Sequence, residues 1–236
     1  MSSRAEPTSR RTRPAKAPLS RRSILEATMA LIRERGVEAV SLRDVAKAVD
    51  TGAASLYAYF ENRDVLLEHA LDDAYGRVPL VPAVDGDWRP ALAATITNTI
   101  TTLESYPGLG AVALGPIPTH PGALRLAEHE LALMEIGGVE PKTAALAVDL
   151  IAQFAAATAV EGTGRRRLMR ADHQRTEATS AYANADTQQF PRVSALATAL
   201  TDADERSRRD FAIEVILGGL VHVSSTGHPR QRPSQR

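Results

Sequence analysis

Apolar residues recur every three or four positions along most of the chain, a spacing that predicts helices rather than strands. Leu25, Met29 and Ile32 form the first such set. Ser20 precedes them and is a residue type that caps helices, and Gly36 follows them and is a typical helix stop. The sequence therefore predicts a first helix between Ser20 and Gly36.

Two short helices and a longer one follow in the same pattern. Ser41 and Asp44 have the spacing of a capping box, which predicts the start of a second helix. Asp50 lies in the turn after it, where a left-handed backbone is expected, and a third helix is expected over about 52–59. A fourth helix is expected to begin at Asn62 and to end before the next proline.

The segment 19–78 is predicted to be a helix-turn-helix module. The second helix of such a pair lies in the major groove, and small side chains at its N-terminus allow close approach to the base edges. Leu56 and Phe60 are expected to point into the small core, whereas Tyr57 either faces DNA or packs inside the domain. The predicted DNA contacts are Ser41, Arg43, Gly52, Ala53, Ala54, Ser55, Tyr57, Tyr59, Asn62 and Arg63.

The remaining chain is also predicted to be helical, so the fold class is all-α. After a connector with prolines and glycine, helices are expected from Asp87 to about Tyr106 and from Pro121 to Ile136. The glycine- and proline-rich stretch 109–122 between them suits a pocket wall. The segment 162–189 is polar and weakly periodic, and it is expected to be a mobile loop with at most one short helix.

Two long apolar helices are expected at 141–161 and from about Glu205 onward. The second carries apolar residues almost all round, so it needs cover on every side. We expect a second copy of the chain to supply that cover, the alternative being a core helix within one chain. A dimer would also carry two recognition helices roughly 34 Å apart. The predicted dimer interface contains Leu150, Phe154, Ala157, Phe211, Val215, Gly218 and His222.

Charge is distributed unevenly although the formal net charge is zero. Residues 1–18 form a basic arm that is expected to be disordered and either follows a phosphate backbone or is a solubilising tail. A helix-turn-helix domain over 19–78, an effector and dimerisation domain over 79–224 and a disordered tail over 225–236 complete the predicted organisation.

Composition and motifs argue against catalysis and export. The chain has no cysteine, its six histidines are scattered, and it contains no zinc-protease, nucleophile-elbow or phosphate-loop motif. His129, Glu130 and Glu135 are interpreted as a solvated face rather than a metal site. Paired arginines at Arg21 and Arg22 are followed by charges instead of an export signal's apolar run. We expect a cytoplasmic protein that is not an enzyme and has no cofactor, metal or membrane partner.

The stretch "SILEATMALIRERGVEAVSLRDVAKAVDTGAASLYAYFENRDVLLEHAL" resembles the N-terminal domain of the tetracycline-repressor (TetR) family of bacterial transcriptional regulators. The resemblance implies a homodimeric repressor that binds a near-palindromic operator and releases it when a small molecule binds the C-terminal domain. Asp50 replaces the usual turn glycine, and Gly52 the usual capping serine. The alternative function is a constitutive DNA-binding protein without ligand control.

The C-terminal half resembles the tetracycline repressors themselves, more weakly, through "WRPALAATI", "VALGPIP", "ELALMEIGG", "FAAATAVEG" and "FAIEVILGGL". Ala113 stands where those repressors carry a metal-binding histidine, which argues against a metal-chelated tetracycline as the effector. Each residue of the pocket that this resemblance implies has plain core packing as its alternative. These residues are Thr95, Thr99, Val112, Ala113, Ile117, Glu130, Met134 and Glu161.

Overall fold

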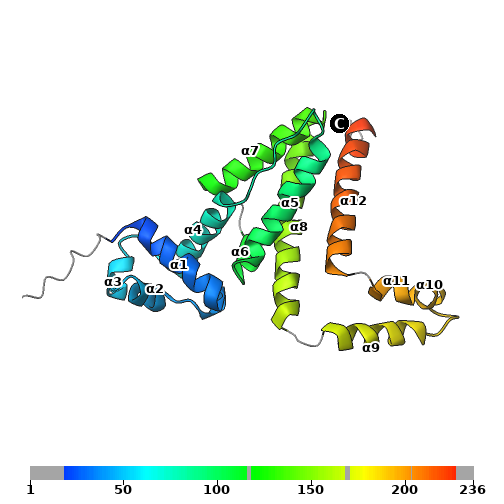
Figure 1. The fold of residues 1–236 in the computed structure, drawn as a ribbon, viewed down its shortest axis with the longest axis horizontal. Coiled ribbons are helices and arrows are strands. Elements are labelled where there is room, and N and C mark those ends of the chain that lie inside the picture. The colour runs from blue at the N-terminus through cyan, green and yellow to red at the C-terminus, as the bar shows by residue number, and fades with distance from the viewer. Residues whose placement is uncertain (1–18, 116–117, 168–170, 203, 227–236) are drawn as a thin grey trace, which may run out of the picture.

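The computed structural model describes residues 19–115, 118–167, 171–202 and 204–226 (Figure 1). These residues form helices joined by turns, with one isolated β-bridge between Val84 and Asp87. The all-α prediction is therefore confirmed. The predicted basic arm and residues 227–236 of the predicted tail lie outside the described residues, and 225–226 belong to the last helix.

Four α-helices and a short 3-10 helix build the N-terminal domain: α1 (Arg21–Arg35), η1 (Val37–Ala39), α2 (Leu42–Ala48), α3 (Ala53–Leu56) and α4 (Arg63–Gly76). Ser41 and Asp44 form the predicted capping box, and Asp50 has the predicted left-handed backbone, with φ of 52°. The third helix is shorter than predicted, because the chain leaves regular helix after Leu56 and turns toward Phe60.

The C-terminal domain begins with α5 (Trp88–Glu104), α6 (Leu109–Ala113), α7 (Pro121–Ile136) and α8 (Pro141–Arg167). It continues through α9 (Ala171–Ala183), α10 (Pro191–Ala195) and α11 (Ala197–Asp202) to α12 (Glu205–Thr226). Helices α5, α7, α8 and α12 pack into a bundle, and α6 lies between that bundle and the N-terminal domain (Figure 1).

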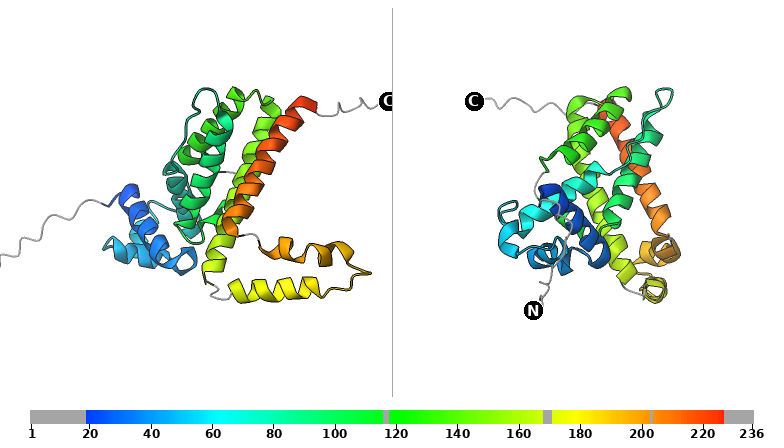
Figure 2. Two further views of the ribbon diagram at one scale, coloured as in Figure 1. Left: turned by 45° about the vertical axis from the view of Figure 1, so that its right-hand side comes forward. Right: turned by 60° about the vertical axis from the view of Figure 1, so that its left-hand side comes forward.

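The expected mobile loop at 162–189 is instead largely helical. It contains the end of α8 and all of α9, a helix of 13 residues. Helices α9, α10 and α11 pack on one another and project from the bundle as an arm, which is visible from two sides (Figures 1 and 2). These helices are stabilised by packing on one another. Each buries little apolar surface by itself, so the weak periodicity of the sequence did not predict them.

Two apolar clusters hold the molecule together, and one of them crosses the domain boundary. It joins the core of the helix-turn-helix domain to Leu103, Tyr106 and Leu109 of the C-terminal domain. At the same junction, the Arg33 guanidinium donates a hydrogen bond of 2.7 Å to the Tyr106 hydroxyl. Helix α6 therefore packs against the core of the N-terminal domain. The second cluster lies between α5, α7, α8 and α12.

Helix α8 is apolar enough along Pro141–Thr163 to match a membrane span by length and composition, with a mean hydropathy of 1.6. In the fold it packs against α5, α6, α7 and α12. Only part of its surface is covered by these neighbours, and its outward side carries exposed Leu146 and Leu150.

Candidate DNA-binding face, effector site and dimer face

The tip of α3 and the exposed side of α2 form one continuous candidate DNA-binding face. Gly52, Ala54 and Ser55 are exposed, and the Tyr57 side chain is 57% exposed. The alternative in which Tyr57 packs inside the domain is therefore wrong. Leu56 is fully buried, as predicted, because it lies on the opposite side of the same short helix. Arg43 on α2 is exposed beside this tip.

Other predicted contacts hold the domain together. The Tyr59 hydroxyl donates to the Leu19 carbonyl at 2.9 Å, and Ser41 and Asn62 cap α2 and α4. The Arg63 guanidinium donates to the carbonyls of Val37 at 2.6 Å and of Val40 at 2.9 Å. Both side chains therefore satisfy carbonyls distant in sequence, so we expect the removal of either one to lower the stability of the domain.

Replacing Arg63 by alanine is expected to lower the free energy of unfolding by about 2 to 3 kcal/mol, because two partly buried carbonyls lose a charged donor. Urea denaturation of the full-length protein measures this change. Arg43→Ala is the matched control, since Arg43 is an exposed arginine of the same domain. Equal stability of the Arg63→Ala variant and the wild-type protein would contradict the assignment.

The described residues of the predicted effector pocket divide into three groups by exposure. Thr95 and Thr99 of α5 and Glu130 and Met134 of α7 are each buried, and Val112 and Ala113 are partly exposed on α6. Glu161 is exposed and lies 3.2 Å from Arg208 of α12, so its helix turns it away from the buried group. Ile117 lies outside the described residues.

Glu130 is the acidic residue among these four buried residues. Its side chain is 3% exposed, and burial raises the pKa of its carboxyl to about 8. Within the part of the chain that the structure describes, no hydrogen bond reaches this carboxyl. Burial, and secondarily the charge of Glu130, raises the pKa of the Tyr75 hydroxyl of α4 to about 12. Burial of Glu130 thus favours the protonated form of its carboxyl.

The neighbouring His129 is occupied elsewhere. Its Nε2 lies 3.1 Å from the Val81 carbonyl and 3.4 Å from the Thr95 hydroxyl. The interpretation of His129 and Glu130 as a solvated face is therefore wrong, because α7 turns both toward α4 and α5. Among the described residues, no group of three or more histidine, cysteine or carboxylate side chains has the arrangement of a metal site.

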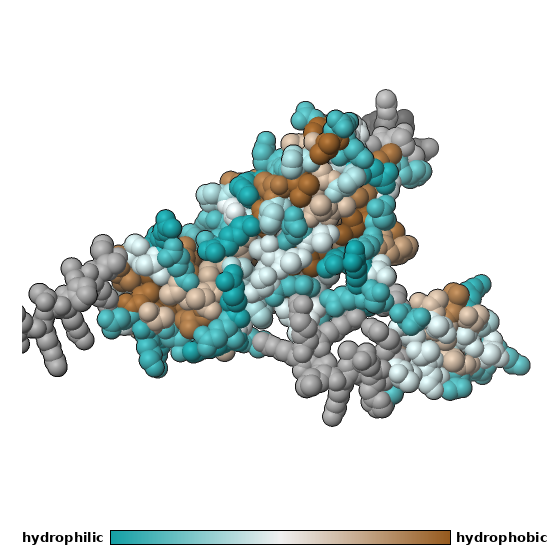
Figure 3. Space-filling model, viewed as in Figure 1, coloured by the Kyte–Doolittle hydropathy of each residue, from teal (hydrophilic) through white to brown (hydrophobic). Residues whose placement is uncertain are grey.

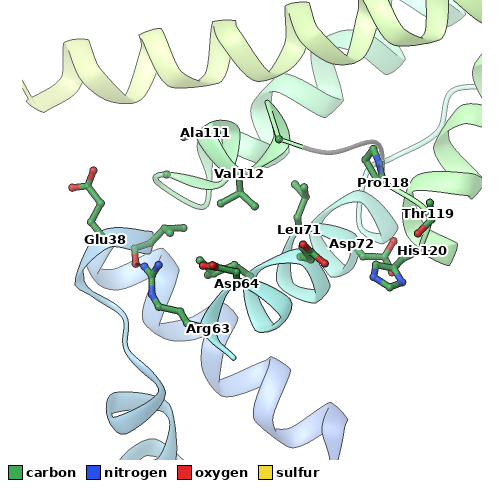
Figure 4. Close-up of a pocket in the computed structure, with 15 residues that line it drawn as sticks. Glu38, Arg63, Asp64, Leu71, Asp72, Ala111, Val112, Pro118, Thr119 and His120 are labelled. Carbon is green, nitrogen blue, oxygen red and sulfur yellow. Dashed lines mark hydrogen bonds between the residues drawn. The ribbon is translucent and has the colours of Figure 1, made fainter. Parts of the chain in front are cut away.

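A cleft of about 800 Å³ separates the N-terminal domain from α6 and the start of α7 (Figure 4). We refer to it as the interdomain cleft. Among the described residues, Val112 is the member of the predicted pocket that lines this cleft, and the other described lining residues were not predicted to form a pocket. A signal for it existed in the spacing of Asp64, Glu68 and Asp72, four residues apart on one face of α4. The opposite wall comes from distant segments, which no local pattern joins.

A pair of histidines closes one end of the interdomain cleft. The rings of His69 on α4 and His120 before α7 are stacked with centroids 4.4 Å apart. Nη1 of Arg21 lies 3.3 Å from Nε2 of His69. Burial, and then the neighbouring His120 and Arg21, lowers the pKa of the His69 ring. This contact joins α1, α4 and the start of α7.

Apolar side chains remain exposed on the side of the bundle formed by α8 and α12. Phe211 is 71% exposed, Val215 57% and Leu150 50%. Space-filling Figure 3 shows apolar, brown residues at the surface of the C-terminal bundle. The other predicted interface residues accompany them: Phe154 is partly buried, and Ala157, Gly218 and His222 are exposed. A shallow apolar groove of about 300 Å³ runs between the two helices.

Comparison with known proteins identifies the chain over most of its length. The family described as "Bacterial regulatory proteins, tetR family" matches residues 24–70, and "Tetracyclin repressor-like, C-terminal domain" matches residues 81–223. The HTH-type transcriptional repressor DrrR1 of Streptomyces coeruleorubidus is 29% identical over 168 residues, which are 69% of this chain and 60% of that repressor. The chain thus spans less than two thirds of that relative's length.

Several solved structures have the same fold as this chain. Apo ActR of Streptomyces coelicolor superposes with a TM-score of 0.82 at 26% identity, covering 90% of this chain and 99% of ActR. ActR was also solved in complex with actinorhodin. The putative transcription regulator SCO7704, also from Streptomyces, is 32% identical with a TM-score of 0.69, covering 92% of this chain and all of that one. The chain therefore belongs to the TetR family of transcriptional regulators, with an N-terminal helix-turn-helix domain and a tetracycline-repressor-like C-terminal domain.

Proposed function

We propose that this protein is a homodimeric, cytoplasmic repressor that binds a near-palindromic operator and is released from it by a small-molecule effector. The shared apolar core between the DNA-binding domain and α6 carries the proposal most strongly. Through such a core an effector can act on DNA binding, provided that the effector has different affinities for two arrangements of the domains. A coupling of about 1 to 3 kcal/mol would change operator affinity roughly 5- to 150-fold.

The proposed DNA complex places α3 of each protomer in a major groove. The small, exposed residues Gly52, Ala54 and Ser55 permit close approach of the backbone, and Tyr57 flanks them. Arg43 is the charged residue that we assign to DNA contact on α2. Sequence selection on random duplexes, followed by gel shifts with the enriched duplex, tests whether an operator exists and whether it is palindromic.

The Arg43→Ala variant is expected to bind that operator about 5- to 150-fold more weakly, because one good phosphate or base contact contributes roughly 1 to 3 kcal/mol. Its melting temperature is expected to equal that of the wild-type protein. Arg192→Ala is the control, since Arg192 is an exposed arginine on α10, far along the chain from α3. Unchanged operator binding in Arg43→Ala would remove this residue from the interface.

Effector control is tested separately from DNA binding. Thermal-shift screening of metabolites and antibiotics finds compounds that stabilise the fold, and gel shifts then ask whether they release the operator. A compound that does both supports the proposed function. If every stabilising compound leaves operator affinity unchanged, the protein is a constitutive DNA-binding protein.

A further inference from the structure

We propose that the contact between α4 and the start of α7 is an acid-sensitive joint, which opens when His69 gains a proton and thereby weakens operator binding. The effect on operator affinity rests on the proposed function, whereas opening of the joint does not require DNA. We call this contact the α4–α7 joint. Its residues are His69 and Asp72 of α4, and His120, Gly122 and Ala123 at the start of α7.

The α4–α7 joint holds a helix of the DNA-binding domain against a helix of the C-terminal domain. The Ala123 amide donates a hydrogen bond of 3.0 Å to Oδ1 of Asp72. At Gly122 the helices approach so closely that a Cβ atom would lie 2.1 Å from the Asp72 carbonyl oxygen. Arg125 of α7 donates to the Val78 carbonyl, just after α4, at 3.1 Å. The start of α7 is thus fixed to α4 at several points.

Two histidine rings stack across the joint and meet an arginine of α1. The rings of His69 and His120 lie 4.4 Å apart between centroids, with 27° between their planes. Nη1 of Arg21 lies 3.3 Å from Nε2 of His69, and the same guanidinium covers the Phe60 ring with its Cζ 4.9 Å from the centroid. Because arginine carries only donors, its contact with Nε2 is a hydrogen bond when that nitrogen is unprotonated. The observed contacts therefore suit an uncharged His69 ring.

A proton on His69 acts against these contacts. It removes the acceptor of the Arg21 hydrogen bond and places two cations side by side. Burial, then His120 and Arg21, opposes charging of the ring, whereas Asp72 and Glu68 of α4 favour it. The opposing influences are larger, so the pKa of the His69 ring is lowered. A group that is harder to charge in the closed joint than in an open one favours opening as pH falls.

Operator gel shifts across pH test the effect on DNA binding. Between about pH 7.5 and about pH 5, a range that includes the ordinary histidine pKa of about 6.5, the affinity of the wild-type protein is expected to fall at least about fivefold. His69→Gln keeps an acceptor oxygen for Arg21 but does not titrate, so it is expected to lose this acid response.

His129→Gln is the matched control for the acid response. His129 lies on α7 outside the joint, with its Nε2 3.1 Å from the Val81 carbonyl, and glutamine keeps a donor for that carbonyl. This variant is expected to retain the acid response of the wild-type protein. A response that persists in His69→Gln, or one that is lost in His129→Gln, would overturn the assignment.

A second variant tests the neighbouring cation. Arg21→Gln keeps a donor for His69 but removes the charge, so the ring is expected to gain its proton at higher pH. The midpoint of the acid response is therefore expected to move to higher pH, whatever the affinity of this variant at neutral pH. A midpoint that stays in place or moves to lower pH would contradict the proposed role of the Arg21–His69 contact.

Energy transfer within one chain tests the joint without DNA. The sequence contains no cysteine, so Ala48→Cys in α2 and Glu128→Cys in α7, both at exposed positions, can carry a pair of pH-insensitive fluorophores. Labelled chains are diluted into excess unlabelled protein, so that transfer reports distances within single chains. Transfer efficiency is expected to change across this pH range and to stay constant when His69→Gln is added. Constant transfer without that substitution would overturn the proposal.

The two measurements distinguish this inference from the proposed function. If energy transfer shows opening but operator affinity does not respond to acid, the joint stands and its control of DNA binding is contradicted. If no operator is found, the proposed function fails, and energy transfer still decides whether the joint opens. If an effector releases the operator but neither measurement responds to acid, the proposed function stands and this inference is overturned.

Discussion

Replacing Val215 by glutamate is expected to leave a folded monomer that binds the operator at least about a hundredfold more weakly. Val215 is 57% exposed in the single chain and borders the apolar groove of α8 and α12. In a symmetric dimer the same surface of each protomer meets its counterpart, so one substitution introduces two buried charges. Like charges brought together at an interface cost several kcal/mol. Each recognition helix would then bind its half-site alone.

Sedimentation equilibrium measures the mass of the variant, and gel shifts measure its operator affinity. Val84→Glu is the control because Val84 is 69% exposed but lies in the connector before α5, outside the predicted interface. It is expected to remain dimeric with unchanged DNA binding. A stable dimer of the Val215→Glu variant would show that α12 does not form the interface.

Glu130→Gln is expected to change how stability depends on pH. Burial raises the carboxyl pKa from 4.5 to about 8, so between these pH values the folded protein holds a proton that the unfolded chain has released. Stability from this group is therefore fully present below about pH 4.5 and is lost as pH rises through 8. The limiting slope is about 1.4 kcal/mol per pH unit, which amounts to several kcal/mol over the whole interval.

Urea denaturation of the wild-type protein and the variant across that interval measures the difference in unfolding free energy. As pH rises, the free energy of unfolding of the Glu130→Gln variant is expected to increase relative to that of the wild-type protein. The comparison is necessary because the lowered pKa of His69 acts in the opposite direction, removing stability as pH falls below about 6.5. Glu128→Gln is expected to show no such trend. Parallel pH curves for Glu130→Gln and wild type would mean that the carboxyl is ionised in the folded protein.

Local signals were sufficient to predict the N-terminal domain in considerable detail. The Ser41–Asp44 capping box and the left-handed Asp50 depend on interactions within a few residues. The same signals overestimated the length of the third helix. Its end depends on the packing of Leu56 and Phe60 into the domain core, which the periodicity of the sequence does not specify.

Side-chain roles at the candidate sites were predicted less well. Arg63 has the position of a phosphate contact in the sequence, yet its guanidinium binds carbonyls 23 and 26 residues away. Glu130 has the pattern of a residue on a solvated helix face next to His129, yet α7 turns it into the core. In both residues the chemistry of the side chain is visible in the sequence, but its surroundings are not.

The sequence by itself determined the all-α class, the strongly periodic helices, the family and the candidate DNA-binding face, because capping, periodicity and turn preferences act over one or two helical turns. Only the tertiary structure decided which polar groups have partners, where a cleft lies between the domains, and which apolar side of α8 and α12 is left uncovered. These properties arise where segments distant in sequence meet, and burial and hydrogen bonding at such contacts depend on all of the packed segments together.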